Sequence, residues 1–139
     1  MSDARTDTAT EAAVVAAFDA LETALCRQRD GEAAWRLFVD EDDAMMWGSA
    51  PDEVAVGNAA IGKLFRELTA ANSAGFEFRW DIKNVRVEGD VAWVNAVGEW
   101  VDDSSGEVET GPYRVSAVLL RRDGAWLWHT FTGSEPAKP

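Results

Sequence analysis

The fold of this chain is decided by residues 76–134, which read FEFRWDIKNVRVEGDVAWVNAVGEWVDDSSGEVETGPYRVSAVLLRRDGAWLWHTFTGS. Turn-forming residues divide this stretch at three places: Gly89-Asp90, residues 102–106, and Asp123-Gly124. The four segments between these turns are rich in valine, tryptophan, phenylalanine and leucine, and each is long enough to cross a sheet. The stretch therefore predicts four consecutive antiparallel strands.

The first of these segments contains a break in its alternation. Phe78, Trp80 and Ile82 alternate with polar residues, but after Lys83-Asn84 the apolar positions shift by one. One extra residue in a strand produces such a shift and bends the strand. We therefore predict a β-bulge at residues 83–84, and the bend favours a strongly curved sheet.

The last hairpin predicts which side chains share a face. A two-residue turn at Asp123-Gly124 sets Leu119 opposite Trp128 and Ala117 opposite Thr130. On this register one face carries eight residues, which are Tyr113, Val115, Ala117, Leu119, Trp126, Trp128, Thr130 and Thr132. His129 then lies on the opposite face.

The residues before this stretch predict three helices and one short strand. Val14, Phe18, Leu21 and Leu25 form one apolar stripe of a first helix, and Glu22 is expected to lie largely off that stripe. The other expected elements are a helix at 32–39 capped by Asp30, a strand at 44–49 with a brief extension at 54–56, and a helix at 58–70.

Length and charge exclude several classes of protein. A chain of 139 residues corresponds to one domain, and its formal charge of -12 would be repelled by nucleic acid or an anionic membrane. No apolar run approaches the roughly 20 residues that span a bilayer, and residues 1–5 lack the apolar core of a secretion signal. The single Cys26 cannot form an internal disulfide and has no identifiable base nearby, so we expect an inert thiol and a cytoplasmic protein.

Several short segments together resemble one known family. The segments are Trp47–Glu53, Val56–Ile61, Gly89–Val94 and Asp123–Trp126. In their order and spacing they resemble the SnoaL-like branch of the nuclear-transport-factor-2-like superfamily. The resemblance implies an α+β fold in which three N-terminal helices pack on a strongly curved, mostly antiparallel sheet, a cone-shaped α+β barrel with a pocket at its open end. It also implies one domain at residues 10–134, with a disordered leader at 1–9 and a flexible tail at 135–139.

The strand at residues 91–100 indicates a second covered surface. Its two faces are both largely apolar, and a helix layer covers only one face of a sheet. We therefore expect a homodimer that forms through the outer face of the sheet. Dimerisation through the sheet is also frequent in the family that the chain resembles.

Two classes of function are compatible with these residues. The first is a binding domain for a small apolar ligand, without a cofactor. Its expected pocket residues are Trp47, Phe65, Trp80, Trp100, Tyr113, Trp128, Thr130 and Thr132. The second, implied by the resemblance, is a cofactor-free isomerase or cyclase, ketosteroid isomerase-like or polyketide cyclase-like, that transfers a proton on a small apolar carbonyl compound.

The enzyme alternative needs a general base, and three side chains are candidates. Glu53 is expected in a loop at the rim of the pocket, where a solvated carboxylate is the competing interpretation. Glu99 stands among apolar residues, where it serves either as a base or as the partner of a charge across the dimer. His129 is the only histidine, but its predicted outward position favours an interface or structural role.

No metal site is expected. The acidic run at residues 40–43 lacks the interleaved spacing of a calcium loop, and adjacent side chains point in different directions, so a solvated turn is expected. His129 has no second histidine or cysteine at a workable spacing for zinc.

Overall fold

The computed structural model describes residues 8–71 and 76–137 of the chain. In chain order its elements are α1 (Thr8–Glu22), the π-helical turn η1 (Thr23–Arg27), α2 (Gly31–Trp35), β1 (Met45–Trp47), β2 (Val54–Val56), α3 (Asn58–Ala71), β3 (Phe76–Glu88), β4 (Val91–Asp102), β5 (Glu109–Arg122) and β6 (Ala125–Ser134). The expected leader at 1–9 falls mostly outside the described residues, but Thr8 and Ala9 already belong to α1.

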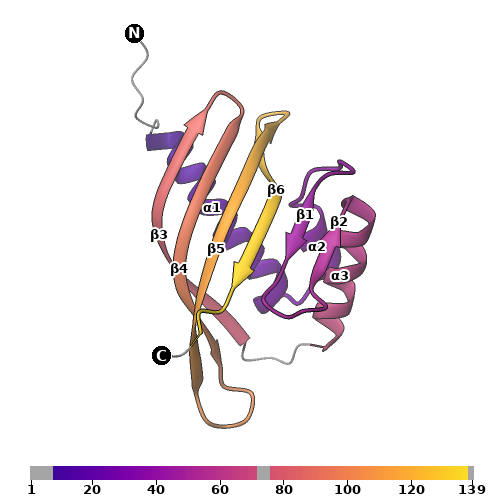
Figure 1. The fold of residues 1–139 in the computed structure, drawn as a ribbon, viewed down its shortest axis with the longest axis vertical. Coiled ribbons are helices and arrows are strands. Elements are labelled where there is room, and N and C mark those ends of the chain that lie inside the picture. Colours follow the sequence, from indigo (N-terminus) through magenta and orange to yellow (C-terminus); the bar gives the residue numbers. More distant parts are fainter. Residues whose placement is uncertain (1–7, 72–75, 138–139) are drawn as a thin grey trace.

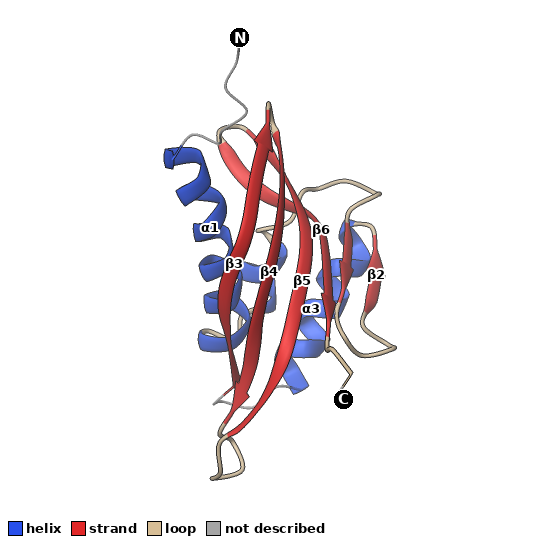
Figure 2. Cartoon of the chain, turned by 60° about the vertical axis from the view of Figure 1, so that its left-hand side comes forward, coloured by secondary structure: helices blue, strands red, loops and turns tan. Residues whose placement is uncertain are grey.

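The six strands form one sheet in the order β2-β1-β6-β5-β4-β3 (Figure 1). Neighbouring strands are antiparallel except β1 and β6, which run parallel. The helices all lie on one side of this sheet, which curves around them (Figure 2). The expected α+β architecture is therefore present: a curved, mostly antiparallel sheet with its helices on one face.

The β3–β4 hairpin has the predicted register. Val87 pairs with Ala92 and Val85 with Val94, because the two-residue turn at Gly89-Asp90 leaves no other alignment. The register shifts between Ile82 and Asn84, which is the predicted β-bulge. Side chains of β4 then alternate strictly between buried and exposed up to residue 97.

The β5–β6 hairpin differs from its prediction beyond Trp128. Leu119 pairs with Trp128 as expected, but the next pair is Val118 with Thr130, so the expected pairing of Ala117 with Thr130 is wrong. His129 is an extra residue in β6, a second β-bulge, and it reverses the alternation of the residues that follow. Phe131 consequently turns into the core, where it is buried.

The core is built around a large aromatic cluster. The indole of Trp128 is buried, and its ring centroid lies 4.9 Å from that of Phe18, 6.3 Å from that of Phe38 and 5.4 Å from that of Phe131. These rings come from α1, from the segment after α2 and from β6, so the cluster joins the helices to the sheet. Buried aromatic rings in edge-to-face contact contribute more to stability than their apolar area alone.

Two side chains before the sheet set the path of the chain. Asp30 caps α2 as predicted, because its carboxylate accepts a hydrogen bond from the backbone N–H of Ala33 at 3.1 Å. The Asn58 amide accepts a hydrogen bond from Trp35 Nε1 at 3.0 Å and donates one to the Val39 carbonyl at 3.1 Å. Asn58 thereby ties the start of α3 to α2 and to the segment that follows it.

The helices of the described part of the chain are too short or too polar to serve as a membrane span.

Candidate functional site

A pocket opens at one end of the sheet, the lower end in Figure 1, where β3 and β5 begin and β4 and β6 finish. Its volume is about 340 Å³. Leu25 and Leu68, from η1 and the last part of α3, close it on the helical side. The pocket is large enough for a small organic molecule.

Five aromatic side chains form the wall that the sheet provides: Phe76, Phe78, Trp100, Tyr113 and Phe131. Neighbouring rings are in contact, with centroid distances of 5.2 Å between Phe76 and Phe78 and 4.9 Å between Phe78 and Tyr113. Phe76 and Trp100 are stacked at 6.4 Å. A ligand that entered the pocket would therefore meet a continuous aromatic surface.

Tyr113 is the buried polar group of this wall. Its hydroxyl is hydrogen-bonded with Ser49, and burial raises the pKa of Tyr113 to about 12, so the phenol is neutral at pH 7. The hydroxyl packs directly against Gly133, where a side chain of any size would collide with it. Gly133 therefore permits the position of the phenol.

Four carboxylates line the pocket, at Glu53, Asp102, Glu109 and Glu135. Glu53 Oε1 accepts a hydrogen bond from the backbone N–H of Ala50 at 2.8 Å. The two oxygens of Glu135 accept hydrogen bonds from Trp100 Nε1 at 3.0 Å and from Ser49 Oγ at 2.8 Å. Asp102 Oδ1 accepts hydrogen bonds from the backbone N–H and the Oγ of Ser104 at 2.9 and 2.6 Å, so donors hold three of the four carboxylates in place.

The eight residues that the sequence predicted for a pocket are not brought together. Trp100 and Tyr113 line the pocket described above, and Trp80 lines a cleft of about 20 Å³ next to it. Phe65 and Trp128 are buried in the core instead. Two of the eight therefore lie where a ligand of the main pocket would touch them.

The remaining three residues of that set lie on the opposite face of the sheet. Trp47 is exposed, and it pairs with Thr132, while Thr130 follows the bulge at His129. The neighbours that face inward are Met46 and Phe131, both of which line the pocket. The inward orientation predicted for Thr130 and Thr132 is wrong because the bulge reverses the alternation.

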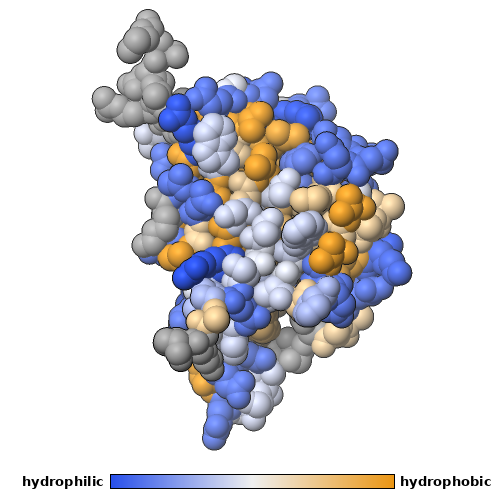
Figure 3. Space-filling view, viewed as in Figure 1, coloured by the Kyte–Doolittle hydropathy of each residue, from blue (hydrophilic) through white to orange (hydrophobic). Residues whose placement is uncertain are grey.

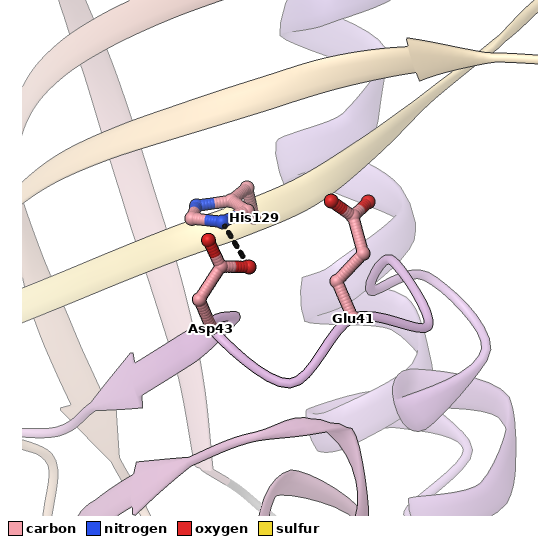
Figure 4. Close-up of side chains that lie close together, drawn as sticks. All are labelled: Glu41, Asp43 and His129. Carbon is pink, nitrogen blue, oxygen red and sulfur yellow. Dashed lines mark hydrogen bonds and ion pairs between the residues drawn. The ribbon is translucent and has the colours of Figure 1, made fainter.

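The three candidate bases lie at three different places in the structure. Glu53 lines the pocket. Glu99 lies on the outer face, where its Oε1 is 3.5 Å from Arg79 Nη1 and its side chain is 42% exposed. His129 is not among the residues that line the pocket, and it faces Asp43 of the acidic run before β1 (Figure 4). Of the three, Glu53 alone touches the space a substrate would occupy.

His129 forms a small cluster with Asp43 and Glu41, both from the acidic run before β1 (Figure 4). His129 Nε2 lies 3.1 Å from Asp43 Oδ1, and Nδ1 lies 2.7 Å from Thr130 Oγ1. One potential ligand atom from each of the three residues lies within 4.8 Å of the others. The three side chains are therefore close enough to bind one metal ion together. However, Arg122 already pairs with Glu41 at 3.3 Å, and the cluster is on the surface, which favours an ordinary ion-pair network.

Glu22 is a buried carboxylate that the sequence interpretation placed off the apolar stripe. Its side chain is 5% exposed, with Oε1 at 3.1 Å from Arg27 Nε and Oε2 without a hydrogen-bond partner. Burial raises the pKa of this carboxyl above its usual value. Glu22 lines the small apolar cleft that shares Leu25, Phe78 and Phe131 with the main pocket.

A signal for the burial of Glu22 was present in the sequence. Glu22 stands four residues after Phe18, which is the spacing of one helical face. The π-helical turn that follows, closed by the hydrogen bond from Gln28 N–H to the Thr23 carbonyl at 2.8 Å, could not be read from the sequence.

Cys26 lies in η1 and contributes its thiol to the lining of the pocket. Burial raises the pKa of Cys26 to about 12, so the thiolate form is negligible at neutral pH. This agrees with the inert thiol that the sequence predicted.

Comparison with known proteins identifies the type of domain. A family model described as "SnoaL-like domain" matches residues 14–137. No protein of curated function is similar enough in sequence to count as a relative.

Solved structures resemble the fold along its whole length. A protein of unknown function with a cystatin-like fold from Nostoc punctiforme is 13% identical, with a TM-score of 0.79 and 96% of each chain covered. A nuclear-transport-factor-2-like superfamily protein from Salmonella enterica is 15% identical, with a TM-score of 0.77 and 95% of each chain covered. A ketosteroid isomerase-like protein from Erwinia carotovora is 20% identical, with a TM-score of 0.72, and the match covers 95% of this chain and 100% of that one. Similarity at these identities establishes the fold.

Proposed function

Since the chain belongs to the SnoaL-like domain family of the nuclear-transport-factor-2-like superfamily, we propose that it binds a small molecule in the aromatic pocket between the ends of β3–β6, η1 and α3. The observation that carries this proposal is the pocket itself. It has a volume of about 340 Å³, an apolar wall of contacting rings, and a few polar groups at defined positions. Ligand sites in proteins combine these same features.

The geometry indicates how a ligand would be held. Its apolar part would lie against Phe78 and Trp100, where each buried ring face contributes favourable contact area. The hydroxyls of Ser49 and Tyr113 are neutral groups that can exchange hydrogen bonds with a polar atom of the ligand. No cofactor is needed for binding of this kind.

The proposal is tested by following the Trp100 indole N–H signal in NMR spectra while a library of small aromatic compounds is added. We expect a subset of the compounds to shift this signal at submillimolar concentration. The variant Leu68→Trp fills the pocket from α3 and should abolish the shifts. Ala70→Trp adds the same ring at an exposed position of α3 and should leave them intact. A library that shifts no pocket signal would contradict the proposal.

A cofactor-free isomerase or cyclase, acting by proton transfer on a small carbonyl compound, is the second candidate, and Glu22 is the observation that favours it. A buried carboxyl with a raised pKa beside an apolar pocket is a suitable general base. Glu53 is the alternative base, because it lines the pocket directly. Once a carbonyl ligand is found, exchange of its α-hydrogen for deuterium should depend on one of these two groups. Exchange that survives in both Glu22→Gln and Glu53→Gln would exclude them.

A further inference from the structure

The charged groups that line the pocket all have the same sign. They are the carboxylates of Glu53, Asp102, Glu109 and Glu135, and the described lining contains no arginine, lysine or histidine. The other two titratable groups of the lining are the Cys26 thiol and the Tyr113 phenol, and burial raises the pKa of each to about 12, which keeps them neutral. The described lining of the pocket therefore presents negative charge and no positive charge.

Within residues 8–71 and 76–137, no ion pair joins any of these four carboxylates to a basic group. Among residues 8–71 and 76–137, the ion pairs of other acidic groups, such as Glu22 with Arg27 and Glu41 with Arg122, do not extend to them. Their partners are neutral donors instead: the Ala50 amide for Glu53, the Trp100 indole and the Ser49 hydroxyl for Glu135. The negative charges of Glu53 and Glu135 are thus held in position, and no basic group of the described residues compensates them.

These carboxylates stand directly beside aromatic rings. Trp100 Nε1 donates its hydrogen bond to Glu135, so an indole and a carboxylate face the same space. Ring faces attract cations, and carboxylates attract them more strongly. A neutral ligand would remove water from the carboxylates without replacing that hydration, and an anion would be repelled by them.

A fifth carboxyl lies behind the aromatic wall. Glu22 lines the cleft that shares Leu25, Phe78 and Phe131 with the pocket, and its Oε2 has no hydrogen-bond partner although its side chain is 5% exposed. Oε1 of Glu22 is already paired with Arg27, so the open group is Oε2, a buried acceptor separate from the four carboxylates of the pocket that a hydrogen-bond donor would satisfy.

We propose that the ligand of this pocket is an organic cation, an amine or quaternary ammonium compound whose apolar body lies on the aromatic wall and whose charged head lies among Glu53, Glu135 and their acidic neighbours. This inference rests on the ligand-binding function proposed above and specifies its ligand. The net charge of -12 would additionally raise the concentration of cations near the molecule.

Three probes that differ only in their head group test the inference: 4-phenylbutylamine, 4-phenylbutanol and 4-phenylbutanoate. Binding to the full-length chain is measured by isothermal titration calorimetry at low salt, with the Trp100 indole signal confirming the location. The amine should bind about tenfold more tightly than the alcohol, and the carboxylate should bind most weakly. A second titration is made in 0.5 M salt, an ionic strength about ten times that of the low-salt buffer. The preference for the amine should be smaller there, because added ions screen exposed charges.

Variants connect the preference to the carboxylates. Glu53→Gln combined with Glu135→Gln should bring the affinities of amine and alcohol close together while the alcohol still binds. Glu11→Gln removes one charge from an exposed position in the first turn of α1 and should leave the ratio unchanged. Equal or tighter binding of the alcohol to the wild-type chain would overturn the cation inference and leave the proposed binding function standing. A failure of all three probes to shift Trp100 at millimolar concentration would count against both.

Discussion

At the scale of single residues, the carboxyl of Glu22 combines features that oppose each other. Its Oε1 is paired with Arg27, which favours the charged form, while burial among Phe18, Leu21 and Trp80 disfavours that form. Burial has the larger effect, so the pKa is raised. A buried carboxyl of this kind costs stability at neutral pH, which is typical of groups kept for function.

Replacing Glu22 by glutamine should therefore stabilise the chain in a pH-dependent way. A carboxyl with a raised pKa in the folded state binds its proton more tightly there than in the unfolded state. Its contribution to stability is complete below the unfolded pKa, near 4.5, and is lost as the pH rises through the folded pKa. Glu22→Gln has no such loss, so we expect a melting temperature a few degrees above that of the wild type at pH 8, with the difference closing at about pH 4. Thermal unfolding followed by circular dichroism measures the melting temperatures of the variant and the wild type at each pH.

Glu11→Gln is the matched control for this prediction, because Glu11 is exposed at the beginning of the same helix. It should change the melting temperature little at either pH. A lower melting temperature of Glu22→Gln at pH 8 would mean that the ion pair with Arg27 outweighs the cost of burial.

At the scale of elements, the two β-bulges explain which parts of the site could be predicted. The bulge at residues 83–84 is visible in the sequence because β3 has one apolar and one polar face, so a change of phase shows. The bulge at His129 is hidden, since Trp126, Leu127 and Trp128 are apolar on both faces. In such a run the pattern of apolar residues does not show which side chains face the core, so a shift by one residue leaves no trace in the sequence.

The bulge at His129 explains why part of the predicted pocket lining was wrong. Because of this bulge, Phe131 faces the helices, and Thr130 and Thr132 face outward. The pocket therefore lacks these two expected hydrogen-bonding groups. Trp100 and Tyr113 line the pocket, as expected, because β4 and β5 pair without a register shift up to that end of the sheet. The carboxylates of Glu109 and Glu135 were missed, since their position follows from how the strand ends meet in space.

The cap of α2 gives a prediction at this scale. The Asp30 carboxylate satisfies the free N–H of Ala33 at the start of a helix of only five residues. Asp30→Ala leaves that donor to water, so we expect a loss of about 1 kcal/mol in the free energy of unfolding, measured by urea denaturation. Asp30→Asn keeps an acceptor at the same position and should retain nearly all of the stability. Equal destabilisation by both variants would show that the charge rather than the cap matters.

At the scale of the whole molecule, the sheet has one face toward the helices and one that no helix of the described residues covers. Most of this layout was predictable, because turn residues defined the hairpins and one-sided helical stripes defined the face that helices occupy. The outer face carries exposed apolar side chains in two places, Val91, Trp93 and Val97 on β4 and Trp47, Val54 and Val56 on β1 and β2. Hydrophobic groups are visible over both regions, with polar groups around them (Figure 3).

Within the apolar region of β4, polar side chains form a ladder that crosses three strands, β3, β4 and β5. Asn95 donates a hydrogen bond to Asn84 at 2.9 Å and accepts one from Ser116 at 2.8 Å. Exposed apolar side chains with hydrogen-bonded polar groups among them resemble the mixed composition of subunit interfaces. We therefore propose that two copies of the chain associate through this face, as the sequence led us to expect.

The proposed dimer makes a prediction for molecular mass in solution. At micromolar concentration, size-exclusion chromatography with light scattering should give the mass of two chains. Trp93→Lys combined with Val97→Lys places like charges on facing copies and should give the mass of one chain with unchanged circular dichroism. Val108→Lys makes a matched change at a highly exposed apolar residue between β4 and β5, outside the two apolar regions, and should remain dimeric. A wild-type chain that elutes with the mass of one copy, or a Val108→Lys variant that dissociates as readily as the double variant, would show that the outer face of β4 is not the interface.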